Sequence, residues 1–200
     1  CDYWIDNDGF VIEKGIKLFN LNIFKLRGQH NIQNLLLATA AARKIGLTNE
    51  QIKNSLKSYK QLPHRLETIY KTNDIEIIND SKATNFDSTI ASINSINGSI
   101  ILISGGRIKD GDYKSWVNII IKKVDTIFLY GESSELLKKH LQEGGYTKKL
   151  FIFNLLLELV DEVVKYSKKE NKKVILFSPS CSSFDQFKNY EERGNLFKTL

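Results

Sequence analysis

Methionine is absent from the 200 residues, and proline and cysteine occur only twice each. Two cysteines, at positions 1 and 181, do not make a disulfide framework, which favours a reducing compartment, the cytoplasm. No apolar run approaches the roughly 20 residues that a helix needs to cross a bilayer, so we expect no membrane insertion. Because even the first residue is not methionine, we expect the chain to be a segment of a longer protein.

The charge balance is basic, with a net charge of +6. Basic proteins can bind nucleic acid, but the lysines here are scattered along the chain. We therefore interpret them as solvated faces and expect no nucleic-acid partner. A preference for anionic substrates is the milder consequence. No set of cysteine and histidine residues has the spacing of zinc ligands, and no metal site is predicted within the chain.

The hydrophobic pattern predicts two domains, residues 1–62 and 63–200. The first begins with short strand-like runs and continues with apolar residues at helical spacing. Residues 62–65 contain a proline and break the helical pattern, so we interpret them as a linker.

From residue 66 onward, apolar β-branched runs alternate with helical patterns. Strands are predicted at residues 75–78, 100–103, 126–130, 150–153 and 174–177. Helices are predicted at residues 88–96, 113–122, 132–142, 155–166 and 187–200. Continuous apolar strands separated by helices are typical of a parallel sheet that is covered on both faces. The predicted fold class is therefore α/β, a Rossmann-like, mostly parallel sheet with helices on both faces.

Two helix starts carry the pattern of a capping box, in which glutamine follows serine or threonine by three residues. Thr48 and Gln51 predict one capping box. Ser183 and Gln186 predict the other, at the start of the last helix. Residues 191–193 of that helix, Glu-Glu-Arg, are interpreted as a solvated face.

Polar residues gather after three of the predicted strands, in residues 79–84, 104–109 and 178–183. In open parallel sheets, ligands bind beyond the carboxyl ends of the strands. These loops carry cationic and hydroxyl side chains: Lys82, Thr84, Arg107, Lys109 and Ser183. We predict a cationic, donor-rich pocket for carboxylate or phosphate. Whether Ser183 only caps a helix or also binds the ligand is left open by its spacing.

Two other features of these loops carry less chemistry. The glycine-rich residues 105–111 fit neither the Walker A loop nor the dinucleotide fingerprint, because Asp112 follows Gly111 and because two glycines are adjacent. The lone Cys181 is interpreted as a small buried hydrophobic residue, since nothing in the sequence places a base beside it.

Four motifs occur in an informative order. They are Gly-Gln-His-Asn-Ile-Gln-Asn at 28–34, Leu-Pro-His-Arg-Leu-Glu at 62–67, Asn-Asp-Ser-Lys-Ala-Thr-Asn at 79–85 and Ser-Pro-Ser-Cys-Ser-Ser-Phe-Asp-Gln-Phe at 178–187. Together they resemble the Mur ligases over essentially the whole chain. The first two are shared across that family. The last two resemble its members that add D-glutamate to UDP-N-acetylmuramoyl-L-alanine.

The resemblance implies an ATP-dependent ligase of peptidoglycan precursor synthesis, acting through an acyl phosphate and as a monomer. Residues 1–62 would be the C-terminal part of a central ATP-binding domain, and residues 63–200 a Rossmann-like amino-acid-binding domain. The P-loop and the ligands of Mg²⁺ would precede Cys1, so the chain alone is expected to be inactive. Its expected partners are UDP-N-acetylmuramoyl-L-alanine, D-glutamate and ATP.

The resemblance also implies a role for individual residues. The catalytic residues, which neutralise phosphoryl charge, would be Lys82 and Arg65. The residues near the nucleotide would be Asn31, Asn34, Arg65 and Asp80, with Asp80 at the ribose. The D-glutamate pocket would contain Thr84, Lys109, Ser183, Phe184 and Tyr190. Ile108 and Asp110 depart from the Gly-Gly-x-Asp-Lys-Gly loop that is frequent in the family.

Two alternatives stay open at this point. One is another Mur-type or folylpolyglutamate-type amide ligase, which would share the motifs but take a different amino acid. The other is a non-catalytic anion-binding module.

Overall fold

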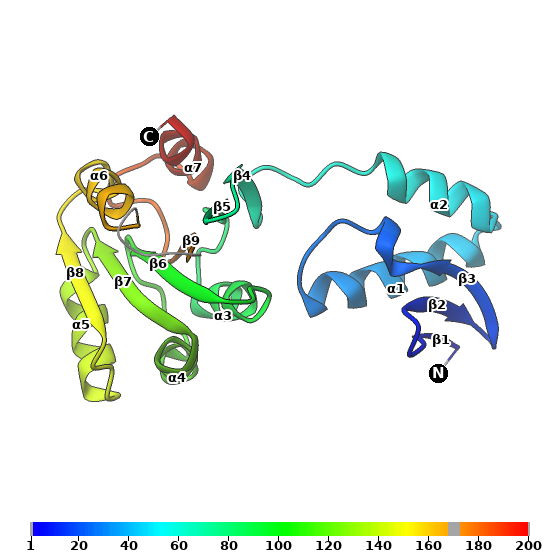
Figure 1. Cartoon of the computed structure of the whole chain (residues 1–200), viewed down its shortest axis with the longest axis horizontal. Coiled ribbons are helices and arrows are strands. Elements are labelled where there is room, and N and C mark those ends of the chain that lie inside the picture. The colour runs from blue at the N-terminus through cyan, green and yellow to red at the C-terminus, as the bar shows by residue number, and fades with distance from the viewer. Residues whose placement is uncertain (1, 168–172, 200) are drawn as a thin grey trace. The chain divides into compact units, whose positions relative to one another are not determined.

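The computed structural model describes residues 2–167 and 173–199, so Cys1 lies outside the described residues. The chain forms two compact units, Cys1–Gln61 and Leu62–Leu200 (Figure 1). The first unit contains a three-stranded antiparallel sheet and helices, in the order β1 (Tyr3–Ile5), β2 (Phe10–Glu13), β3 (Ile16–Asn20), the 3-10 helix η1 (Leu21–Ile23), α1 (Gln29–Lys44) and α2 (Asn49–Ser58).

A small apolar cluster holds the first unit together. Val11 and Phe19 are paired across β2 and β3, and they pack with Leu35 of α1 and Ile52 of α2. The predicted capping box at α2 is confirmed. Thr48 Oγ1 accepts a hydrogen bond from the Gln51 amide at 3.2 Å, and the Gln51 side chain accepts one from the Thr48 amide at 2.8 Å.

The second unit is built on a six-stranded sheet in the order β4-β5-β9-β6-β7-β8. Only β4 runs antiparallel to its neighbour, so the predicted mostly parallel sheet is confirmed. The strands are β4 (Glu67–Lys71), β5 (Ile75–Asn79), β6 (Ser99–Gly105), β7 (Val124–Tyr130), β8 (Lys149–Phe153) and β9 (Lys173–Ser180). The helices are α3 (Phe86–Asn94), α4 (Tyr113–Lys123), α5 (Ser134–Glu143), α6 (Leu156–Ser167) and α7 (Tyr190–Thr199). Strands β1 and β4 were not predicted.

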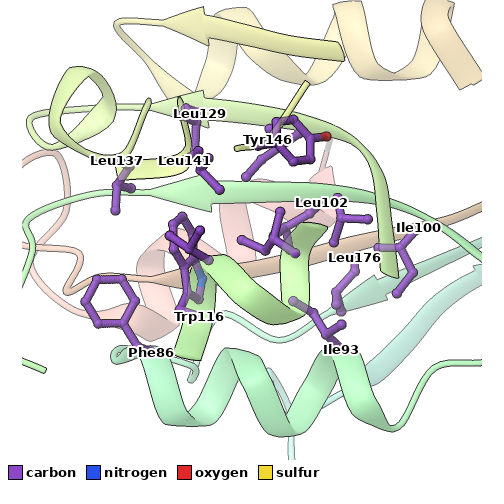
Figure 2. Packing of buried hydrophobic residues seen from close by; sticks show 14 of the residues in the cluster. Phe86, Ile93, Ile100, Leu102, Trp116, Leu129, Leu137, Leu141, Tyr146 and Leu176 are labelled. Atoms are coloured by element: carbon purple, nitrogen blue, oxygen red, sulfur yellow. The ribbon is translucent and has the colours of Figure 1, made fainter. Parts of the chain in front are cut away.

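Helices cover both faces of this sheet, which explains why its strands are continuously apolar (Figure 1). On β6, alternate residues enter different clusters, with Leu102 facing α3, α4 and α5, and Ile103 facing α6 and α7. Figure 2 shows the first cluster, in which Ile93 and Trp116 from the helices meet Leu102 of the sheet. Among the described residues, no helix combines the length and apolar character that crossing a membrane requires.

The predicted capping box of Ser183 and Gln186 is wrong. The Gln186 side chain is used elsewhere: it accepts a hydrogen bond from the Leu156 amide at 3.1 Å and donates one to the Asn154 carbonyl at 2.9 Å. Residues 183–187 form a turn instead, and α7 begins at Tyr190.

The core position of Leu102 leads to a first prediction. Leu102→Ala should lower the free energy of unfolding of the second unit by about 2–5 kcal/mol, because it leaves a cavity in a fully buried cluster. Leu157→Ala on the exposed side of α6 is the control and should change it by less than about 0.5 kcal/mol. Urea unfolding followed by Trp116 fluorescence in a Trp4→Phe background measures both. Equal effects of the two substitutions would contradict the assigned packing.

Candidate functional site at the carboxyl edge of the sheet

The loops after β6 and β9 are joined backbone to backbone. The Arg107 amide donates to the Ser182 carbonyl at 3.0 Å, and the Ser182 amide donates to the Arg107 carbonyl at 2.9 Å. Gly106 permits this approach, because a Cβ atom there would lie 2.3 Å from the Ser182 carbonyl oxygen. Its φ of +123° is also one that other residues rarely adopt. Two of the three predicted site loops therefore meet directly.

Arg193 of α7 connects the remaining loop, which follows β5, to the loop after β9. Its side chain is fully buried, and its Nε and Nη2 atoms donate to the Ser81 hydroxyl at 3.0 Å and the Ser81 carbonyl at 2.7 Å. Its Nη1 atom donates to the Cys181 carbonyl at 3.0 Å. The prediction that residues 191–193 are a solvated face is wrong for Arg193, which is fully buried and donates hydrogen bonds to both loops. Gly194, next to it, is the sequence signal for such close packing.

His64 is buried in its neutral form against the same helix. The Asn79 amide nitrogen donates to the Gly194 carbonyl at 3.0 Å and contacts His64 Nδ1 at 3.1 Å, so Nδ1 accepts and the ring proton sits on Nε2. Burial lowers the pKa of His64, which keeps the ring uncharged at neutral pH. A Cβ atom on Gly194 would lie 2.3 Å from Nδ1, so only glycine leaves room for the ring.

The turn that carries Arg65 is strained on both sides. His64 and Leu66 have φ angles of +62° and +48°, which cost about 1–3 kcal/mol each in residues that are not glycine. Hydrogen bonds hold the turn: the Leu66 amide donates to Asp80 Oδ1 at 3.1 Å, and the Lys82 amide donates to the His64 carbonyl at 3.0 Å. Arg65 itself is exposed, so the turn presents its side chain beside the loop that carries Lys82.

The buried carboxylate of Asp80 holds the turn and the neighbouring elements together. Its Oδ2 atom accepts hydrogen bonds from the hydroxyls of Ser92 at 2.5 Å and Ser178 at 2.8 Å, while Oδ1 takes the Leu66 amide. Burial raises the pKa of Asp80 to about 6, although these donors and Arg65 favour the charged form. Both oxygens are therefore occupied by the chain itself, and the ribose contact of Asp80 stays a prediction.

Two of the predicted site residues are in direct contact. The ammonium nitrogen of Lys82 lies 3.8 Å from the centre of the Tyr190 ring. Ser81, one residue before Lys82, donates its hydroxyl to the Tyr190 carbonyl at 2.8 Å. The structure thus joins the loop after β5 to the start of α7 at the position of both residues.

The other predicted residues are placed on the same loops or in the first unit. Thr84 is half-buried in the loop before α3, and Lys109 is exposed in the loop after β6. In the loop after β9, Ser183 is buried and Phe184 is 60% exposed. In the first unit, Asn31 donates its amide to the Arg27 carbonyl at 2.6 Å, and Asn34 is exposed on the second turn of α1. Their roles stay predictions.

The described residues do not suggest a cysteine nucleophile or a metal site at this edge of the sheet. Burial raises the pKa of the Cys181 thiol to about 12, so it stays protonated, in keeping with a structural residue. Within residues 2–167 and 173–199, no group of three or more histidine, cysteine, aspartate or glutamate side chains could hold a metal ion.

The buried Asp80 predicts a pH dependence of stability. Its pKa is about 6 in the folded chain against an ordinary value of 3.8, so the folded chain binds the proton more tightly. The associated stabilisation is complete below about pH 4 and is lost as the pH rises through about 6, by about 3 kcal/mol in total.

Urea unfolding between pH 4 and 7.5 measures this effect. Wild type should lose about 2 kcal/mol relative to Asp80→Asn across that range. The control Asp87→Asn, at an exposed position of α3, should follow the wild-type profile. Parallel profiles for wild type and Asp80→Asn would show that the carboxylate is not held as described.

Comparisons with known proteins bear on the site as a whole. A sequence model described as "Mur ligase, glutamate ligase domain" matches residues 64–181. The UDP-N-acetylmuramoylalanine--D-glutamate ligase of Prochlorococcus marinus (strain MIT 9515) is 60% identical over 200 residues, which are 100% of this chain and 42% of that protein. The ligase of the same name from strain MIT 9312 is 61% identical, with 100% and 43% covered. The chain thus spans less than half the length of these relatives.

Solved structures share the fold at low identity. The UDP-N-acetylmuramate-alanine ligase MurC of Thermotoga maritima is 15% identical with a TM-score of 0.65, over 94% of this chain and 41% of that one. A Mycobacterium tuberculosis folylpolyglutamate synthase is 13% identical with a TM-score of 0.65, over 90% and 45%. These likenesses show the fold alone. Because the family model matches residues 64–181, more than half of the chain, the chain belongs to the Mur ligase family.

Proposed function

We propose that this chain serves an ATP-dependent ligase that adds D-glutamate to UDP-N-acetylmuramoyl-L-alanine in the cytoplasm. The proposal rests on one observation: a single buried arginine joins residues 79–85 to residues 178–187, the two motifs that resemble D-glutamate-adding ligases. Arg193 binds Ser81 in the first and Cys181 in the second. The relatives at 60% and 61% identity bear the name of that activity.

The two units take different parts in this proposal. We assign residues 1–62 to the C-terminal part of a central ATP-binding domain, with Asn31 and Asn34 toward the nucleotide. We assign residues 63–200 to the domain that binds the amino acid. The described residues offer no cluster for Mg²⁺, so no step is assigned to a metal bound by them.

Lys82 and Arg65 are the charges that act on the phosphoryl group. When bound, ATP supplies the phosphoryl that converts the alanine carboxylate of the acceptor into an acyl phosphate. Lys82 is half-buried and Arg65 is exposed, and hydrogen bonds fix the backbone that carries both before substrate arrives. Preorganised charges of this kind stabilise the transition state without a reorganisation cost.

The donors of the neighbouring loops suit the carboxylates of D-glutamate. We assign Thr84, Lys109 and Ser183 to those carboxylates, with Phe184 and Tyr190 at the edge of the pocket. The amine of D-glutamate, held in this way, forms a C–N bond at the acyl carbon, the C–O bond to phosphate breaks, and the amine gives up a proton. Asp80 contributes by fixing the turn that carries Arg65, and we assign its remaining acceptor capacity to the ribose.

Removal of the Lys82 charge tests the catalytic assignment. In the full-length ligase, Lys82→Met should reduce kcat by about 100-fold or more, because a preorganised charge contact to the phosphoryl is lost. Lys122→Met, at an exposed position of α4, is the control and should leave kcat unchanged. Phosphate release in the presence of ATP, D-glutamate and the UDP-linked acceptor measures both. An unaffected Lys82→Met enzyme would favour a non-catalytic anion-binding module.

The identity of the amino acid needs a separate test. The full-length ligase should form product with D-glutamate and not with L-glutamate, L-lysine or a diamino acid, at saturating ATP. Product formation with a diamino acid and none with D-glutamate would assign the chain to another Mur-type ligase.

A further inference from the structure

We propose that Tyr190 is a positioning residue that holds the Lys82 ammonium on the face of its ring. The proposal rests on the proposed function of Lys82 and goes beyond it, because the resemblance suggests only a place beside the amino-acid pocket for Tyr190. The 3.8 Å between Lys82 Nζ and the ring centre is well within the roughly 6 Å at which a cation is attracted by the ring quadrupole.

Hydrogen bonds fix the backbone of Tyr190 next to Lys82. The Tyr190 carbonyl accepts the Ser81 hydroxyl, and Arg193, one turn further along α7, donates to the hydroxyl and the carbonyl of Ser81. Ser81 immediately precedes Lys82, so the two main chains are locked together next to the contact. The Tyr190 ring also forms a T-shaped pair with the buried His64 ring, with centroids 6.2 Å apart.

An uncharged aromatic ring is a suitable partner for a lysine that must act on an anion. A carboxylate partner would hold the ammonium equally well, but it would cancel the charge that the phosphoryl group needs. An aromatic ring orients the ammonium without forming an ion pair. The Glu191 carboxylate lies within electrostatic reach of Lys82: its pKa is lowered first by the bond from the Tyr190 hydroxyl and also by the Lys82 charge. Hydrogen bonding to Glu191 raises the pKa of the Tyr190 hydroxyl, so the ring stays uncharged at neutral pH. The long lysine side chain, which is flexible in water, is thereby restricted before substrate binds.

The contact can be tested in the 200-residue chain without any activity. In proton–carbon NMR spectra, the Lys82 Cε protons should be displaced upfield by the ring current, and Lys82→Arg assigns the signal by its loss. Tyr190→Phe should keep the displacement and Tyr190→Leu should abolish it. Tyr70→Leu, on the exposed face of β4, is the control and should leave it unchanged. An undisplaced signal in wild type, or one unaffected by Tyr190→Leu, would overturn the proposal.

The functional part needs the full-length ligase. Tyr190→Leu should reduce kcat by about 2- to 30-fold, the range expected for loss of one cation–π contact, and Tyr190→Phe, which keeps the ring face, should reduce it by less. Phenylalanine carrying one, two and three ring fluorines at position 190 should lower log kcat stepwise, because fluorine weakens the ring quadrupole at nearly constant shape. The KM for D-glutamate should stay constant through this series.

The outcomes separate the two claims. A flat fluorine series, or a change confined to the KM for D-glutamate, would overturn the positioning role and make Tyr190 a substrate contact. If that happens while Lys82→Met still loses its rate, the proposed function stands without the inference. If Lys82→Met keeps its rate, the proposed function fails, and the NMR displacement still reports whether the contact exists.

Discussion

The buried guanidinium of Arg193 joins parts of the chain that are more than 100 residues apart in sequence, and the arrangement of the site depends on it. Its three hydrogen bonds go to uncharged oxygens of Ser81 and Cys181. A buried charge is costly unless its donors are satisfied, so these bonds stabilise one arrangement of the two loops against all others. The arrangement of the loops therefore also fixes the backbone of Lys82, because Lys82 directly follows Ser81.

A second set of hydrogen bonds acts through Asp80, the residue before Ser81 in the same loop. Asp80 collects the hydroxyls of Ser92 and Ser178 and the amide of Leu66, and it thereby connects α3, β9 and the turn that carries Arg65. The left-handed conformations around Arg65 persist because this network overdetermines them. Two buried ionisable groups thus fix the backbone, while the two cations assigned to chemistry remain accessible.

The parallel sheet and the meeting of polar loops at its carboxyl edge could be predicted, because buried strands are continuously apolar and polar residues follow them at once. Strand β4 could not, since its edge position leaves little hydrophobic signal: Tyr70 is exposed and only Ile69 joins a core cluster. The burial of Arg193 could not be predicted, because it depends on partners that are distant in sequence. The false capping box at Ser183 has the same cause, for Gln186 binds Asn154 and Leu156 instead.

We infer that Arg193 contributes to the proposed reaction by placing Lys82. A double-mutant cycle on kcat of the full-length ligase, with Arg193→Lys and Lys82→Met alone and together, tests it most directly. If Arg193 acts through Lys82, the Arg193→Lys substitution should lower kcat in the wild-type background and have no further effect once Lys82 is methionine. Fully additive losses, measured on the folded fraction of each variant, would contradict the account.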